Sequence, residues 1–98
     1  MTINKQQNGG SLVIKLEGRL DTMTAPALEK EVKGSLDGVT ELTFDFEKLD
    51  YVSSAGLRIL LSAYKAMLGR GTMRIVNLND IIREVFNVTG FADVLQID

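Results

Sequence analysis

The sequence of 98 residues contains no cysteine and no histidine. Without cysteine there is no disulfide framework and no thiolate site for a metal ion. Without histidine the chain also lacks the commonest metal ligand and the usual general base near neutral pH. We therefore expect a protein that is not an enzyme and that uses no cofactor and no metal.

Basic clusters and long apolar runs are also missing. The net charge is -2, whereas binding to nucleic acid requires a concentrated basic surface. No run approaches the roughly 20 apolar residues that span a bilayer, and the polar segment 1–7 lacks the apolar centre of a signal peptide. These absences favour a protein partner over nucleic acid or membrane insertion, and they favour a location in the cytoplasm.

The remaining composition is that of one globular domain over residues 1–98. Hydrophobic residues make up 45% of the chain and charged residues 24%, which argues against a disordered or fibrous protein. A domain of this length buries roughly 60 to 68% of its unfolded surface, so it can form a core without a covalent or metal staple.

The first half of the chain is typical of a hairpin followed by a helix and a strand. The Asn-Gly-Gly turn at residues 8–10 separates two extended segments, the second over residues 11–17. Thr22 or Thr24 can cap the helix that follows, Pro26 suits its first turn, and the Asp-Gly pair at 37–38 is expected to end it. Alternation then predicts a strand over residues 41–46. The expected core positions of these two elements are Ala25, Leu28, Val32, Leu36, Leu42, Phe44 and Phe46.

The segment 50–61 places a serine pair where a short extended run meets the clearest helix of the chain. Either serine can cap this helix by accepting a hydrogen bond from a free backbone N–H, and the first turn of a helix also attracts anions. Gly56 is costly in a first turn, which indicates that something approaches this backbone closely or that the turn packs tightly. The helix is expected to close at Gly69, and its apolar face contains Leu57, Leu60, Leu61, Tyr64, Met67 and Leu68.

The last third predicts a strand, a helix and a short tail. Residues 69–71 lack the spacing of a P-loop and are interpreted as a tight connection to a strand over 72–76. The Asn-Asp pair at 79–80 can cap a helix that ends at Gly90, and residues 94–97 form either a last strand or an ordered tail. The expected buried positions of that helix are Ile81, Ile82, Val85 and Phe86.

Laid end to end, these elements have the order β-β-α-β-α-β-α, with a final strand left open. Single strands alternating with helices imply parallel neighbours joined by right-handed crossovers, and the first hairpin adds an antiparallel edge. We therefore expect an α/β domain whose mixed, mostly parallel sheet carries packed helices.

Three motifs resemble those of the STAS domains, and specifically the bacterial anti-sigma-factor antagonists. The first covers residues 49–57, with the sequence LDYVSSAGL; the second is GRLD at 18–21 with Thr-Ala at 24–25; the third is FNVTGF at 86–91. The resemblance covers nearly the whole chain in the right order. It implies a single STAS-type domain whose partner is an anti-sigma factor that is also a serine kinase. It also implies a second partner, a serine phosphatase that acts on the phosphorylated form of the domain.

Matched residue by residue, the resemblance makes Ser54 the phosphorylation site, with Ser53 as the fallback acceptor or the true helix cap. Arg58 lies one helical turn beyond Ser54, where it can pair with a phosphate or remain a solvated surface arginine. Asp21 is either a loop residue near a helix start or a partner contact. The residues expected to bind the partner are Asp21, Thr22, Ser53, Ser54, Ala55, Gly56 and Arg58.

Two departures from the family pattern keep a second function open. Ser53 stands where many antagonists have an aspartate, and the last helix usual in the family is not expected here. The alternative is a STAS subunit that is not phosphorylated and docks constitutively in a lipid-transport or signalling assembly. A serine nucleophile is disfavoured because no histidine or nearby lysine can serve as its base.

Overall fold

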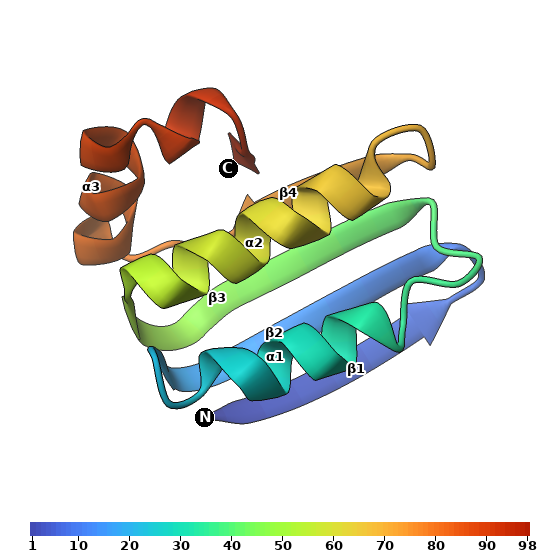
Figure 1. The fold of residues 1–98 in the computed structure, drawn as a ribbon, viewed down its shortest axis with the longest axis horizontal. Coiled ribbons are helices and arrows are strands. Elements are labelled where there is room, and N and C mark those ends of the chain that lie inside the picture. Colours follow the sequence, from blue (N-terminus) through green and yellow to red (C-terminus); the bar gives the residue numbers. More distant parts are fainter.

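A five-stranded mixed sheet forms one layer of the computed structural model, which describes residues 1–98 (Figure 1). The strands lie in the order β1-β2-β3-β4-β5; β1 pairs antiparallel with β2, and the other pairs are parallel. The elements along the chain are β1 (Thr2–Asn8), β2 (Ser11–Leu20), α1 (Ala25–Lys33), β3 (Glu41–Val52), α2 (Ser54–Met67), β4 (Thr72–Val76), α3 (Asp80–Thr89), the 3-10 helix η1 (Phe91–Asp93) and β5 (Gln96–Ile97). The expected α/β fold and element order are confirmed, and the segment left open near the C-terminus forms a two-residue strand.

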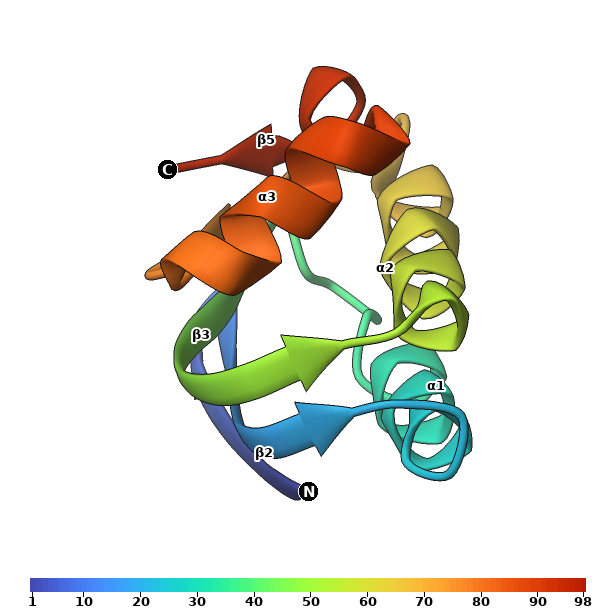
Figure 2. The same cartoon turned by 90° about the vertical axis from the view of Figure 1, so that its left-hand side faces the viewer.

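The core lies between the sheet and the helices. Alternating residues of β3, including Phe44 and Phe46, are fully buried, whereas Thr43 and Asp45 between them are only half-buried. Phe46 meets Phe86 of α3 edge to face, with ring centroids 6.4 Å apart. Figure 2 shows α1 and α2 on one side of the curved sheet. None of the helices has the length and apolar character required to cross a bilayer.

Three details of the helices differ from the sequence-based expectation. The first helix ends at Lys33 rather than at residues 37–38, because the chain tightens after Gly34: the N–H of Ser35 bonds to Val32 O at 3.1 Å, three residues back instead of four. Leu36 therefore lies outside the helix, although it is buried. Leu68 and Ile81 were expected in the core but are 59% and 68% exposed: Leu68 is the extended residue that follows the last turn of α2, and Ile81 lies in the first turn of α3.

The local start and stop signals behave as expected. Asn79 caps α3 by accepting a hydrogen bond from Ile82 N at 2.8 Å. Gly90 ends the same helix with φ 80, in the left-handed region that glycine enters without a steric penalty. The hairpin turn predicted at residues 8–10 joins β1 to β2, with Asn8 as the last residue of β1.

Candidate functional site

The candidate site lies where two neighbouring parallel strands, β2 and β3, reach their carboxyl ends. The register pairs Arg19 with Tyr51 and Leu20 with Val52. Ser53 N then donates a hydrogen bond of 2.9 Å to Leu20 O, which extends the pairing by one step. The loop after β2 and the start of α2 therefore lie side by side, although about 30 residues separate them in the sequence.

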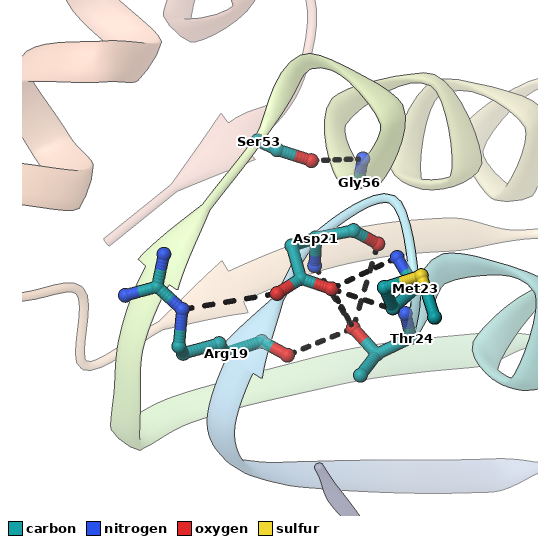
Figure 3. A network of polar contacts seen from close by, with 6 residues as sticks. All are labelled: Arg19, Asp21, Met23, Thr24, Ser53 and Gly56. Carbon is teal, nitrogen blue, oxygen red and sulfur yellow. Dashed lines mark hydrogen bonds and ion pairs between the residues drawn. The ribbon is translucent and has the colours of Figure 1, made fainter.

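Asp21 organises the loop after β2. Its Oδ1 accepts hydrogen bonds from Met23 N at 3.0 Å and from Thr24 N at 3.1 Å (Figure 3). This is an Asx turn, in which a carboxylate replaces a backbone carbonyl as the acceptor for residues further along. The Asp21 carboxylate thus fixes the backbone of the two residues that carry these N–H groups.

Thr24 secures the same loop from the other side. Its hydroxyl donates to Arg19 O at 2.8 Å and accepts from Asp21 N at 2.9 Å. Thr24 occupies the N-cap position of α1, as one of the two expected alternatives, but its side chain makes no capping hydrogen bond because the hydroxyl is used in the loop. Thr22, the other alternative, is exposed.

The environment of Asp21 favours the ionised carboxylate. Partial burial raises its pKa, but hydrogen bonds from the backbone of Thr24 and Met23, the Thr24 hydroxyl and the charge of Arg19 outweigh this. The pKa of Asp21 is therefore lowered from its ordinary value of 3.8. At neutral pH the loop carries a fixed negative charge.

At the start of α2 the two serines have different roles. Ser53 is the N-cap residue, with φ -91 and ψ 173, and its Oγ accepts a hydrogen bond from Gly56 N at 3.3 Å. Ser54 is the first residue of the helix and is exposed to solvent. The cap alternative raised by the sequence thus belongs to Ser53, and the hydroxyl of Ser54 is not needed to cap the helix.

Gly56 is required by close packing between the two halves of the site. A Cβ atom added to it would lie 2.6 Å from Leu20 Cγ and 3.1 Å from Leu20 O. Side chains do not tolerate contacts of that length, so only glycine lets α2 approach the end of β2 this closely. Of the two explanations that the sequence left open, tight packing of the turn accounts for this glycine.

Arg19 and Tyr51 border the loop and were missed by the sequence analysis. The guanidinium carbon of Arg19 lies 4.3 Å from the ring centroid of Tyr51, and Arg19 Nε lies 3.7 Å from Asp21 Oδ2. The first is a cation–π contact, and the second is a long, exposed ion pair that contributes little by itself. The contact of Arg19 with Tyr51 could not be found from the sequence, because it depends on the pairing of β2 with β3.

The structure brings most of the expected partner-binding residues to one end of the sheet. Those on the loop after β2 and in the first turn of α2 are adjacent, and Arg58 is exposed one turn further along α2. No group of three or more acidic side chains is placed to hold a metal ion. The arrangement offers an exposed hydroxyl at a helix N-terminus beside a charged, hydrogen-bonded loop, which is suited to binding.

Comparison with known proteins places this geometry in context. The STAS domain family model matches residues 2–98. A Bordetella bronchiseptica protein named "Putative anti-sigma factor antagonist BtrV" is 31% identical over 99 residues, covering 99% of this chain and 85% of that protein. Among solved structures, an anti-sigma factor antagonist from Mycobacterium paratuberculosis has a TM-score of 0.89 at 25% identity, over 98% of this chain and 83% of that one. The Bacillus cell fate determinant SpoIIAA in its phosphorylated form has a TM-score of 0.77 at 20% identity, over 99% and 91% of the two chains, which is a likeness of fold.

Proposed function

The chain belongs to the STAS domain family, and we propose that it is an anti-sigma-factor antagonist controlled by phosphorylation of Ser54. In the unmodified state it binds a kinase-type anti-sigma factor in the cytoplasm, and a sigma factor is released from that anti-sigma factor. Phosphorylation of Ser54 by the same kinase ends the interaction, and a serine phosphatase restores it.

The observation that carries this proposal is the division of roles between the two serines. Because Ser53 caps α2 through Gly56 N, the hydroxyl of Ser54 can be modified without removing the cap. Ser54 is exposed, as a residue must be to enter the active site of a kinase. Its Oγ attacks the γ-phosphorus of ATP bound by the partner, the bond to the leaving ADP breaks, and the hydroxyl proton passes to a base of the kinase.

A phosphate on Ser54 would change the surface far more than the fold. It adds about -1.5 to -2 charge at neutral pH, at a helix N-terminus that favours anions. Arg58, one turn along the same exposed face, is spaced to pair with it. A docked partner, by contrast, must desolvate or face the new charge. A loss of about 4 kcal/mol in binding weakens a complex roughly a thousandfold, which is enough for a switch.

The test is capture of the partner by baits that differ at one position. Wild type, Ser54→Ala and Ser54→Glu are immobilised, and the captured proteins of the source organism are identified by mass spectrometry. Ser62→Glu is the matched control, since it introduces the same charge on an exposed serine of the same helix, eight residues or about 12 Å further along. We expect an ATP-binding anti-sigma factor with wild type, Ser54→Ala and Ser62→Glu, and its loss with Ser54→Glu.

Two results would contradict the proposal. Equal capture of the same proteins by all four baits would mean that Ser54 is not a switch and that the chain docks constitutively, as a subunit of a lipid-transport or signalling assembly would. Loss of capture with both glutamate variants would mean that negative charge anywhere on α2 is disruptive, so that Ser54 has no special position.

A further inference from the structure

Met23 is the most exposed of the large hydrophobic side chains, at 87%. Single exposed hydrophobic residues are common on protein surfaces and need no special explanation. Met23 differs from the others in its surroundings, because it belongs to the loop organised by Asp21 (Figure 3), and the residue before that loop, Leu20, accepts a hydrogen bond from Ser53 N at the start of α2. Of the other strongly exposed apolar side chains, Ile81 and Val88 lie on α3 and Leu68 follows the C-terminal end of α2.

The backbone that carries Met23 is held in place. Its N–H is bonded to the Asp21 carboxylate, and the residue that follows is fixed through Asp21 and Arg19 O. A side chain on such a loop costs less ordering entropy on binding than one on a free loop. The thioether side chain itself stays adaptable, which suits it to fill an irregular apolar recess.

The loop that carries Met23 begins beside the start of α2. Gly56 of α2 lies against Leu20, which immediately precedes the loop, and Ser53 N bonds to Leu20 O. We therefore expect a partner surface that covers Ser54 to meet this loop as well. Asp21, which accepts a hydrogen bond from Met23 N, its ion-pair partner Arg19 and the exposed Thr22 add polar groups to the same loop, in the manner of an interface whose apolar centre has a polar rim.

We propose that Met23 is the apolar anchor by which this protein docks into a hydrophobic recess of its anti-sigma factor. The proposal rests on the function proposed above, and it specifies the partner further: beside the surface that receives Ser54, the partner carries an apolar pocket the size of a methionine side chain. Affinity comes from burying Met23, while the charge state of Ser54 decides whether that burial can occur.

The experiment measures Kd by isothermal titration calorimetry against the purified anti-sigma factor that the Ser54→Ala bait retains. Met23→Ser is expected to weaken binding about 10- to 100-fold, since it removes the burial of a full apolar side chain. Met23→Leu keeps the volume and apolar character and is expected to bind within about threefold of wild type. Leu68→Ser is the matched control, because Leu68 is also exposed but lies beyond the opposite end of α2, about 20 Å from Ser54, and its replacement is expected to leave Kd unchanged.

Peroxide provides a second, independent arm on the same protein. Hydrogen peroxide transfers one oxygen to the thioether of Met23, giving the sulfoxide and water, and so makes the anchor polar without a substitution. Of the other three methionines, Met67 and Met73 are buried and therefore protected from peroxide. Met1 is present both in wild type and in Met23→Leu, so its oxidation cannot cause a difference between them. Treated wild type is expected to lose affinity as Met23→Ser does, whereas treated Met23→Leu is expected to keep it.

The outcomes separate the anchor from the switch. If Met23→Ser and oxidised wild type bind as tightly as wild type while Ser54→Glu does not bind, the anchor is wrong and the phosphorylation switch stands. If Leu68→Ser weakens binding as much as Met23→Ser, the effect is not specific to this loop and the anchor is also wrong. If no anti-sigma factor is retained by the Ser54→Ala bait, the proposed function fails and the anchor fails with it.

Discussion

Replacing Gly56 with alanine tests whether close packing against β2 determines the geometry of the site. In a helix, alanine is favoured over glycine by about 0.5 to 1 kcal/mol, so a helix in isolation would gain stability. Here the new methyl group would lie 2.6 Å from Cγ and 3.0 Å from Cδ2 of Leu20, and 3.1 Å from its carbonyl oxygen. Leu20 is fully buried, and Cγ is the branch point of its side chain, so it cannot swing away into solvent. Overpacking of this kind costs typically 1 to 3 kcal/mol, which exceeds the gain in helix propensity.

We therefore expect Gly56→Ala to lower the free energy of unfolding by about 1 to 2 kcal/mol, and the melting temperature by roughly 4 to 8 °C for each kcal/mol. Urea denaturation followed by circular dichroism measures the change. The Leu20→Ala background is the control, because removing Cγ and Cδ2 creates room for the methyl group. In that background the same substitution should cost about 1 kcal/mol less, measured as a double-mutant coupling. A Gly56→Ala protein as stable as wild type would refute the packing argument.

Three further predictions concern the cap of α3 and the charged groups of the site. Asn79→Ala is expected to destabilise the protein by about 1 to 2 kcal/mol in urea denaturation, because it removes both the cap of α3 and the 3.1 Å hydrogen bond to Leu49 O. Asn79→Asp keeps only the cap and should recover part of the lost stability. Ser54→Glu is expected to leave thermal stability unchanged or to raise it by up to about 0.3 to 1 kcal/mol at low salt, because a negative charge is favoured at a helix N-terminus, and Arg58→Gln should reduce that gain. A Ser54→Glu protein that melts markedly earlier would mean that its loss of binding reflects unfolding. Because the folded-state pKa of Asp21 is lowered, its stabilising contribution is present above the ordinary pKa of 3.8 and disappears as pH falls through the lowered value. The stability difference between wild type and Asp21→Asn should accordingly be constant near neutrality and shrink below pH about 4, and a difference that is independent of pH would contradict this.

Local signals in the sequence were sufficient to find most of the elements. The turn at residues 9–10, the cap at Asn79 and the stop at Gly90 each depend on neighbours within a few positions, so they can be interpreted without a structure. The end of α1 was wrong because two glycine signals compete over residues 34–38, and the first of them, Gly34, already ends the helix. The pattern of apolar residues does not show at which of two nearby glycines a helix ends.

Helix periodicity predicted which faces are apolar but not how far each face is covered. Ile81 and Leu68 satisfy the spacing of buried residues, yet both are exposed, and both lie at the end of an element: Ile81 in the first turn of α3 and Leu68 just after α2. Whether other elements cover a given position of a helix depends on how the sheet and the helices pack together, and nothing in the neighbouring sequence indicates it. The sequence therefore overestimated the core at the ends of α2 and α3.

The site itself depends on a register that the sequence does not show. The pairing of β2 with β3 shifts twice, between Lys15 and Glu17 and again between Gly18 and Arg19, and these irregularities bring Arg19 opposite Tyr51. A slip of one residue would turn each side chain to the other face of the sheet and remove the Arg19–Tyr51 contact. The motif around Ser54 could be recognised from the sequence, but its contact with the loop that carries Asp21 could not.

The roles of Ser53 and Ser54 also decide how a phosphate would act. A modification of the capping residue would replace the bond from Gly56 N and disturb the start of α2. A phosphate on Ser54 leaves that bond in place, and the loop beside it is held by hydrogen bonds of its own from Asp21 and Thr24. Nothing in this arrangement must rearrange to accept the charge. The modification proposed for Ser54 would therefore be detected by the partner through electrostatic repulsion and desolvation at the shared surface, and not through a change in the fold.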